Sequence, residues 1–332
     1  MKSILVGVTA GVLIFIGIFV TLLWQQTGAP LTIPSRILFH IAKGESVRDI
    51  SADLQKEGAI KNARIFYWYA KFLKKDRALK AGVYELLPSM HLNDLIPLFE
   101  NGSNASVKVT IPEGFSLAQI ALRLKEKGLP VREKDFALSP QDAAPYQFLR
   151  DAPPGASLEG FLFPSTYDFF ADASAKEIRE TLLASFQNHF DPSWYEAAGK
   201  EGKTVFEVVT MASILEKELR SLPDKKIAAG LLWRRLSVGI PLQVDSTINY
   251  ITGKNTPALN SKDASIASPY NTYKNKGLPP GPISNPGTES IEAALFPQAS
   301  EYWFYLSRQD TGETIFSKTL QEQAKAKGKY LK

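Results

Sequence analysis

The pattern of apolar and polar positions starts with a long uncharged, apolar segment near the N-terminus. Residues 4–24 contain 21 residues without a charge, enough to cross a hydrocarbon core of about 30 Å. The apolar core of a signal peptide is shorter, so cleavage near residues 27–29 is the less favoured alternative. We therefore expect a transmembrane helix at 4–24, preceded by a cytoplasmic stub at 1–3.

The basic residues that flank this segment predict its orientation. Lys2 precedes the apolar run, and the next basic residue is Arg36. The positive-inside rule then places the N-terminus in the cytoplasm. The expected location is a single-pass inner-membrane protein, with the bulk of the chain on the periplasmic or extracytoplasmic side.

A duplicated pattern follows the apolar segment. The stretch IAKGESVRDISADLQKEGAI starts at Ile41, and IPEGFSLAQIALRLKEKGLP starts at Ile111, an offset of 70 residues. Each copy predicts a strand, a Gly turn, a Ser N-cap and a short amphipathic helix that ends at Gly. The matching positions are Ile41, Gly44, Ser46, Ile50, Leu54 and Gly58 with Ile111, Gly114, Ser116, Ile120, Leu124 and Gly128.

The remaining segments predict further strands and helices. Residues 80–102 and 159–183 each read as an aromatic strand, a turn and a helix, and the Pro- and Ala-rich stretch 139–157 indicates a boundary. Helical periodicity covers most of 191–240. A Pro-, Gly- and Asn-rich stretch at 268–290 is long for a loop, which is typical of functional loops. A hairpin is expected around Asp310-Thr311-Gly312.

The repeat pattern Gly-x-Ser-x-x-x-Ile-x-x-x-Leu resembles LysM-like modules, which bind glycans containing N-acetylglucosamine. A generic βα unit with a capped helix is an equal alternative. The expected fold class is α+β, with a LysM-like module at 25–106, a second LysM-like repeat and linker at 107–155, and a mainly helical domain with a C-terminal β-hairpin at 156–332.

The amino-acid composition excludes several classes of catalytic and metal-binding site. The net charge is +5, and 44% of residues are hydrophobic against 22% charged, as in ordinary folded proteins. The absence of cysteine excludes disulfides, thiolate zinc sites and a cysteine nucleophile. The three histidines, His40, His91 and His189, all precede residue 190, so a Ser-His-Asp triad cannot form within the last part of the chain. Nucleotide and nucleic-acid motifs are missing.

The stretch MASILEKEL, from Met211 to Leu219, brings two carboxylates onto one predicted helix. At about 100° per residue, Glu216 falls on the apolar face and Glu218 lies about 200° away on a mixed face. Burial raises a carboxyl pKa towards the range that a general acid needs. The alternative is a frayed helix end at which Glu216 pairs with Arg220.

Four stretches, of which the first is the one just described, occur in order along the chain: MASILEKE, GIPLQVDST, SPYNTYKNKGLPPGPISNPG and the terminal hairpin. With the apolar start and the repeat, they resemble the endolytic murein transglycosylases, the YceG-like family. The resemblance implies a membrane-anchored catalytic protein that cleaves peptidoglycan strands between N-acetylmuramic acid and N-acetylglucosamine and leaves 1,6-anhydro-muramyl ends. It implies Glu216 as the acid/base, contact with cell-wall synthesis proteins, and no cofactor or metal.

In such a reaction the substrate's own C6 hydroxyl replaces water, so one glutamate acts first as acid and then as base. Other side chains hold the sugar and stabilise positive charge. The candidates for these roles are Gln243, Asp245, Tyr270, Asn271, Thr272, Tyr273 and, in a supporting role, Glu218.

Each of these candidates has a structural alternative. Asp245 is a candidate helix N-cap, Asn271 a candidate Asx turn, and the tyrosines candidate packing residues.

Two departures from the family pattern bear on these assignments. Val244 to Thr247 stand where the family often has Thr-Asp-Pro-Thr, and Thr314 and Gln323 stand where its hairpin often has histidines. Two rival functions remain: a glycan-binding scaffold without catalysis, and a hydrolytic muramidase that uses water.

Overall fold

The computed structural model describes residues 28–330, apart from 104, 140–142, 255–260 and 309. The expected stub at 1–3 and the expected span at 4–24 therefore lie outside the described residues. Within the part of the chain that is described, no helix is long and apolar enough to cross a membrane.

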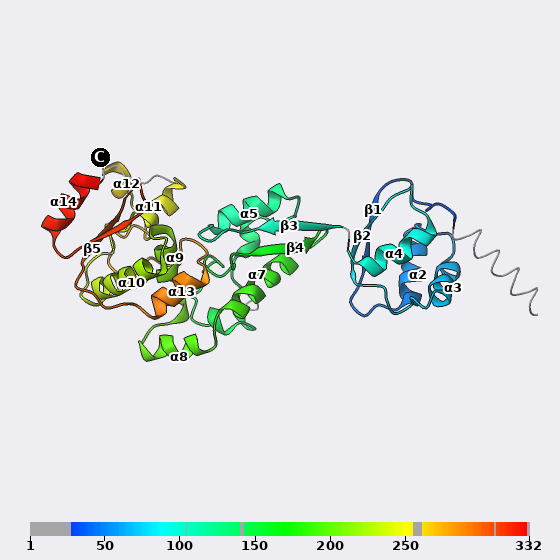
Figure 1. Cartoon of the computed structure of the whole chain (residues 1–332), viewed down its shortest axis with the longest axis horizontal. Helices are drawn as coiled ribbons and strands as arrows, with labels where there is room; N and C mark the ends of the chain where they lie inside the picture. The colour runs from blue at the N-terminus through cyan, green and yellow to red at the C-terminus, as the bar shows by residue number, and fades with distance from the viewer. Residues whose placement is uncertain (1–27, 104, 140–142, 255–260, 309, 331–332) are drawn as a thin grey trace, which may run out of the picture. The chain divides into compact units, whose positions relative to one another are not determined.

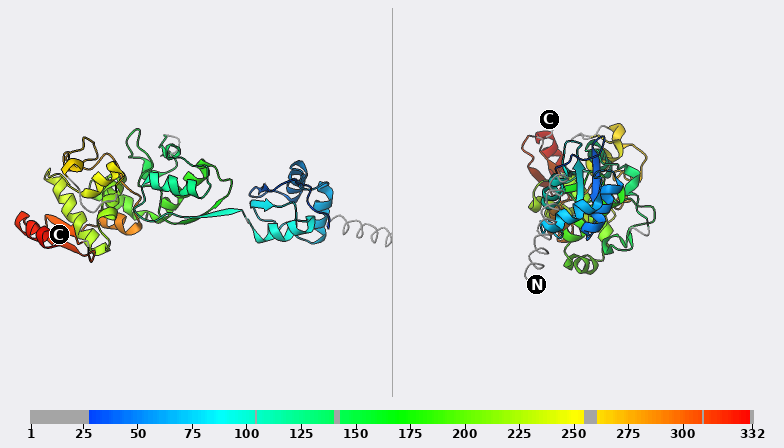
Figure 2. Two further views of the ribbon diagram at one scale, coloured as in Figure 1. Left: turned by 90° about the horizontal axis from the view of Figure 1, so that it is seen from above. Right: turned by 90° about the vertical axis from the view of Figure 1, so that its right-hand side faces the viewer.

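The α+β class is confirmed, and the chain divides into two compact units. Unit 1 comprises the residues up to Lys108 together with Asp168–Ala173, and unit 2 comprises Val109–Tyr167 and Ser174–Lys332. The division falls within one two-stranded ribbon, β3 (Ser106–Thr110) and β4 (Thr166–Phe170), whose strands run side by side (Figures 1 and 2). The second repeat thus belongs to the same unit as the segment that follows it.

Unit 1 packs three helices against a two-stranded sheet. In chain order it contains β1 (Ile37–Ile41), α2 (Val47–Lys56), α3 (Ala63–Phe72), β2 (Gly82–Leu86) and α4 (Leu92–Asn101). The strands are antiparallel, with Phe39 opposite Tyr84. The rings of Phe39, Phe66 and Tyr84 lie 5.8, 6.2 and 4.7 Å from that of Phe99. These four buried rings form the centre of the core of unit 1.

The two repeats fold locally as the sequence predicts. Ser46 caps α2 and Ser116 caps α5 (Leu117–Glu126), each accepting a hydrogen bond from the third helical N–H at 3.3 Å. The turns before them place Gly44 and Gly114 at φ of +83° and +73°. Only glycine adopts this left-handed conformation readily, which explains why both copies carry it.

The first part of unit 2 surrounds β3 and β4. After α5 come two 3₁₀ turns, η1 (Glu133–Phe136) and η2 (Gln147–Leu149), and then α7 (Ala175–His189) and α8 (Ser193–Lys200). The strand-turn-helix predictions for 80–102 and 159–183 are confirmed by β2 with α4 and by β4 with α7. The predicted helices beyond residue 190 are also present.

Helix α9 (Val205–Glu218) lies at the centre of unit 2. Every residue from Val205 to Leu215 except Glu207 is buried. It packs against α10 (Leu222–Ser237), α11 (Asp245–Thr252) and α13 (Thr288–Leu295), and the short α12 (Ser261–Ala264) packs on α11. A Cβ on Gly230 of α10 would lie 2.2 Å from the carbonyl oxygen of Gln298. Glycine is therefore required where the segment after α13 crosses α10.

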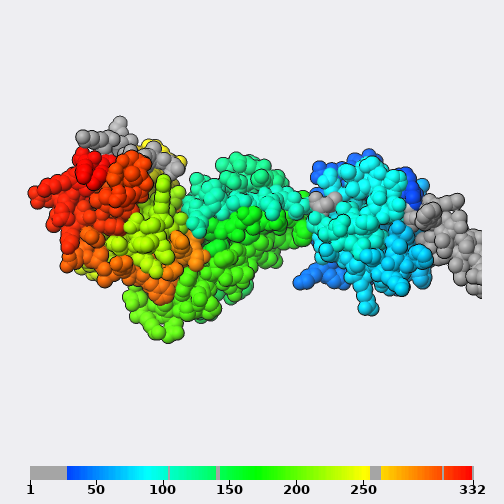
Figure 3. All heavy atoms as spheres, in the orientation of Figure 1, coloured from blue at the N-terminus to red at the C-terminus, as the bar shows by residue number. Residues whose placement is uncertain are grey.

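The predicted C-terminal hairpin is confirmed. Strands β5 (Phe304–Ser307) and β6 (Thr314–Ser317) are antiparallel, and α14 (Leu320–Tyr330) follows them. These elements, orange to red in Figure 3, occupy the end of unit 2 away from β3 and β4. Gln323 donates to the backbone oxygen of Tyr305 at 2.9 Å, so at one position where the family often has histidine this chain has a structural amide.

Candidate functional site

The carboxyl group of Glu216 is held where the last turn of α9 meets the start of α13. Its Oε2 accepts hydrogen bonds from the Ser290 hydroxyl at 2.7 Å and from the Gly287 N–H at 3.1 Å. Gly287 is the N-cap of α13, and helix N-termini attract negative charge. These two donors therefore fix the position of Oε2.

A buried lysine completes this site. Lys225 of α10 reaches Glu216 Oε2 at 3.4 Å, and the two side chains are 3% and 9% exposed. All three contacts are made to Oε2, and among the described residues none is made to Oε1. Among the described residues, the protein thus fixes one oxygen of Glu216 and makes no hydrogen bond to the other.

The alternative pairing of Glu216 with Arg220 is not what the structure contains. Arg220 lies beyond the end of α9, and its guanidinium packs against Gly312 of the terminal hairpin, 3.0 Å from where a Cβ would stand. The end of α9 does not fray, because Leu219 still donates to the carbonyl of Leu215. Glu216 instead pairs with a lysine on the next helix.

A second carboxylate, which sequence analysis did not identify, lies close to Glu216. Glu113 belongs to the Gly turn of the second repeat, and its Oε1 lies 1.9 Å from where a Cβ on Gly287 would stand. Burial, and then the negative charge of Glu216, raise the pKa of Glu113. The repeat gave no signal for this carboxylate, because the first copy has Lys43 at the position of Glu113.

Asn285 ties this turn to the loop before α13. The backbone N–H of Gly114 donates to the Asn285 carbonyl at 2.9 Å, and the Asn285 N–H donates to the Phe115 carbonyl at 2.8 Å. The Asn285 side chain accepts from Leu162 N–H at 2.8 Å and donates to Glu159 Oε1 at 2.9 Å. One asparagine thus connects the second repeat, the segment before β4 and the Glu216 site.

Glu159 is a buried carboxyl group beneath this connection. It is 3% exposed and accepts from Leu117 N–H at 2.9 Å, from Asn285, and from the Tyr250 hydroxyl at 3.3 Å. Burial raises the pKa of Glu159 to about 8, despite these donors. Its contacts are with the N-terminus of α5 and with the loop, which makes it a positioning group.

Glu218 occupies a different environment from Glu216. It accepts from the Ser246 N–H in the first turn of α11 at 3.0 Å and from the Tyr305 hydroxyl at 3.2 Å. Burial raises the pKa of Glu218. The predicted contrast between an apolar face and a mixed face is wrong for α9, because the helix is buried on nearly all sides. The two glutamates differ in their partners instead.

Asp245 and Tyr273 form one pair beside Glu218. The Tyr273 hydroxyl donates to Asp245 Oδ1, and burial raises the pKa of Tyr273. Asp245 is the first residue of α11, and the N-cap is Val244, so the N-cap alternative for Asp245 is wrong by one position. The pair lies against the same helix start that Glu218 caps.

The other predicted binding residues lie in the loop that faces α11. Asn271 is fully buried and makes the Asx turn, accepting from the Tyr273 N–H at 2.9 Å. Thr272 is 2% exposed and bonds to the Thr247 hydroxyl at 2.9 Å. The ring of Tyr270 lies 5.2 Å from that of Tyr250. Substrate contact by these residues stays a prediction.

Gln243 has a distinct conformation. It is exposed, its φ is +52°, and its N–H donates to the Thr272 carbonyl at 3.1 Å. A non-glycine residue in the left-handed region is uncommon and costs conformational energy. The role of this exposed side chain in binding also stays a prediction.

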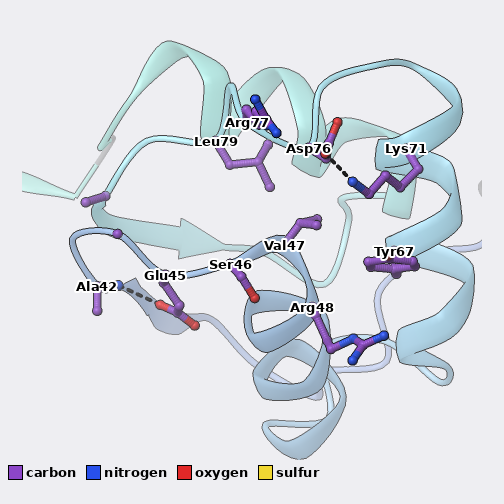
Figure 4. A pocket seen from close by; sticks show the side chains of 12 residues that line it. Ala42, Glu45, Ser46, Val47, Arg48, Tyr67, Lys71, Asp76, Arg77 and Leu79 are labelled. Atoms are coloured by element: carbon purple, nitrogen blue, oxygen red, sulfur yellow. Dashed lines mark hydrogen bonds and ion pairs between the residues drawn. The ribbon is translucent and has the colours of Figure 1, made fainter.

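Unit 1 contains a separate groove of about 600 Å³ (Figure 4). One wall is the turn at Ala42–Arg48, and the opposite wall is formed by Asp76–Ala81 with Tyr67 and Lys71. The guanidinium of Arg48 lies 5.9 Å from the centre of the Tyr67 ring. The turn is the counterpart, in the first repeat, of the one that carries Glu113.

Glu216 is held through one carboxyl oxygen, and Glu113 lies beside it. This arrangement is typical of enzymes that use acid–base catalysis. Among the described residues no cluster of three His, Asp or Glu side chains forms a metal site. Residues 39–329 match the YceG-like family, and the chain belongs to that family.

Similar proteins support this membership. An endolytic murein transglycosylase of Bacillus subtilis is 34% identical over 306 residues, covering 88% of this chain and 84% of that protein. One from Streptococcus pneumoniae is 32% identical over 83% of this chain and 55% of its own length. A crystal structure of a YceG-like protein from Listeria monocytogenes, 36% identical, has a TM-score of 0.58 and covers 87% of this chain and 98% of that one.

Proposed function

We propose that this chain is a lytic transglycosylase that cuts peptidoglycan strands internally, between N-acetylmuramic acid and N-acetylglucosamine, and leaves 1,6-anhydro-muramyl ends. One observation carries the proposal: Glu216 is held on Oε2 by three donors, and Oε1 has no partner among the described residues. Membership of a family whose curated relatives are endolytic murein transglycosylases supports it.

In the proposed mechanism Glu216 acts twice. Its proton, carried on Oε1, passes to the glycosidic oxygen of the leaving sugar as the bond from that oxygen to C1 of the muramyl residue breaks. The Glu216 carboxylate then takes the proton of the C6 hydroxyl, and O6 bonds to C1. No water is consumed, and Glu216 ends in the protonated form in which it began. Lys225, Ser290 and Gly287 keep Oε2 in place throughout.

The role of Glu113 would differ between a lytic transglycosylase and a hydrolytic muramidase. A hydrolase requires a second carboxylate to activate water or attack the sugar, and Glu113 is a carboxylate close to the Glu216 site. In the transglycosylase, Glu113 instead stabilises positive charge on the sugar ring. Glu113→Gln then slows the reaction but leaves anhydro ends as the product.

Product analysis tests the proposal. The full chain is incubated with purified peptidoglycan, and the strand ends are identified by mass spectrometry. Anhydro-muramyl ends are expected, and their loss is expected in Glu216→Gln. Reducing ends indicate a muramidase, and intact strands a binding scaffold. Glu207→Gln is the matched control, because Glu207 lies on the same helix and is exposed. Full activity of Glu216→Gln with inactive Glu218→Gln would refute the assignment.

The setting of the enzyme is part of the proposal. The 21 uncharged residues at 4–24 support anchoring in the inner membrane with the catalytic unit outside the cytoplasm, near the proteins of cell-wall synthesis. There the enzyme ends the elongation of nascent strands. Membrane flotation of the native chain, with protease access from the outer side only, is the expected result, and release by washing with salt would contradict it.

We propose as a second function that the groove in unit 1 binds glycan. The groove combines the Tyr67 ring with the side chains of Arg48 and Lys71, whose N–H groups are donors suited to sugar hydroxyls. To avoid cleavage, binding to insoluble peptidoglycan is measured with Glu216→Gln. Adding Arg77→Ala, which alters the groove wall, is expected to reduce co-sedimentation. Unchanged binding would refute a role for the groove.

A further inference from the structure

Helix α3 of unit 1 presents large apolar side chains to solvent. Trp68 is 54% exposed, Phe72 is 66% exposed, and Leu73, directly after the helix, is 39% exposed. Trp68 and Phe72 are four residues apart, so they lie on one face. Arg64 and Lys71 fall within about 100° of the same direction, at about 100° per residue. The exposed face is therefore both aromatic and basic.

The charge of the chain is concentrated in this segment. Residues 61–77 carry six basic residues and one acidic residue, a net charge of +5, which equals the net charge of the whole chain. The other residues of the chain therefore sum to zero. Some of these basic groups are paired, as Lys71 is with Asp76 and Lys75 with Glu100. The segment as a whole still has a large excess of positive charge.

The sequence also keeps this helix close to the expected membrane anchor. The apolar run ends at Trp24, and Leu31 is already built into the core of unit 1, where its N–H donates to the Met90 carbonyl at 2.8 Å. Seven residue steps span at most about 25 Å. Unit 1 therefore lies within about that distance of the bilayer, if the anchoring proposed above holds.

We propose that α3 rests on the surface of an anionic bilayer, with Trp68 and Phe72 inserted among the headgroups and the basic side chains against lipid phosphates. Interfacial helices combine aromatic and basic residues in this way, and Trp is favoured at the membrane–water interface. A soluble polyanion would neutralise the charge but leave the two rings in water. The rings therefore favour a lipid surface over an acidic polymer.

The absence of cysteine from the chain allows a direct test. Phe72→Cys carries a polarity-sensitive fluorophore, and the labelled full chain is reconstituted into vesicles with or without phosphatidylglycerol. Leu122→Cys on α5 of unit 2 is the matched control, because Leu122 is similarly exposed at 56%. We expect a blue shift, and quenching by spin-labelled lipid, at position 72 and not at 122, and only in anionic vesicles.

A charge variant measures the electrostatic part. One basic side chain near an anionic surface changes partitioning about fivefold, so replacing Arg64 and Lys74 with Gln in the Phe72→Cys chain should weaken insertion about 30-fold. Equal emission at positions 72 and 122 in anionic vesicles would overturn the proposal, as would a shift at 72 that a soluble anionic polymer produces and vesicles do not.

Flotation of the chain with the vesicles tests the membrane anchor, and the fluorescent label separately tests lipid contact by α3. A chain that a salt wash releases from the vesicles refutes the anchoring, while the label at position 72, read before the wash, still reports lipid contact by α3. A shift at 72 in that case supports the surface, and no shift overturns it. A thermal melt of each labelled chain verifies that unit 1 remains folded.

Discussion

Replacing Lys225 by Met isolates the energetic role of the Glu216 pair. The lysine is 3% exposed and its Nζ lies 3.4 Å from Glu216 Oε2. At an effective dielectric constant of 20, that separation corresponds to an attraction of about 5 kcal/mol, most of which the desolvation of both groups offsets. Removing one partner of a buried pair costs about 3–5 kcal/mol.

The loss in this protein should be smaller, because Ser290 and Gly287 continue to donate to the carboxylate. We expect about 2 kcal/mol, which lowers the melting temperature of a unit of about 200 residues by about 4–8 °C. Differential scanning calorimetry of Lys225→Met, of Glu216→Gln and of the double variant measures it.

The double variant provides the decisive comparison. If the pair is real, Glu216→Gln in the Lys225→Met background restores much of the lost stability, because the unpaired charge is gone. Independent groups would instead give a double variant whose loss is the sum of the two single losses. That sum would refute the reasoning about the pair, whatever the activity of the variants.

Three further predictions concern other residues. The pKa of Glu159 lies above its ordinary value, so its contribution to stability is complete below about pH 4.5 and is lost as pH rises through about 8. The melting temperature should therefore fall between about pH 5 and 8. This fall should disappear in Glu159→Gln and persist in the control Glu126→Gln. Ser290→Ala removes a hydrogen bond to a charged group and should reduce kcat about 10- to 100-fold, whereas Ser284→Ala, which loses a bond to the Ser213 carbonyl, should not. Phe99→Ala should cost unit 1 about 3–5 kcal/mol in calorimetry and leave the transition of unit 2 unchanged.

Local structure was predictable where neighbouring residues determine it. Ser46 and Ser116 cap their helices through the third N–H, and the glycines before them take positive φ, all within a few residues of sequence. The hairpin around Asp310-Thr311-Gly312 follows for the same reason. Helix caps and turns depend on residues close together in the sequence, so a single sequence is enough to predict them.

The site was less predictable because its contacts are distant in sequence. The helical wheel identified Glu216 on a helix that is buried nearly all round, where facing direction no longer separates it from Glu218. The partners of Glu216 are Lys225, Ser290 and the N–H of Gly287. These residues are distant from Glu216 in the sequence, so no local sequence pattern predicts the contacts. Glu113 required the packing of the second repeat against the loop before α13.

Asn285 also fixes when the site can exist during synthesis of the chain. Its hydrogen bonds join residues 114–115 and 159–162 to the loop before α13, and Ser290 completes the set of donors to Glu216. A chain released before residue 285 lacks the residue that holds the turn of Glu113, and one released before residue 290 also lacks the Ser290 donor to Glu216. Translation products truncated before residue 285 are therefore expected to lack the assembled site.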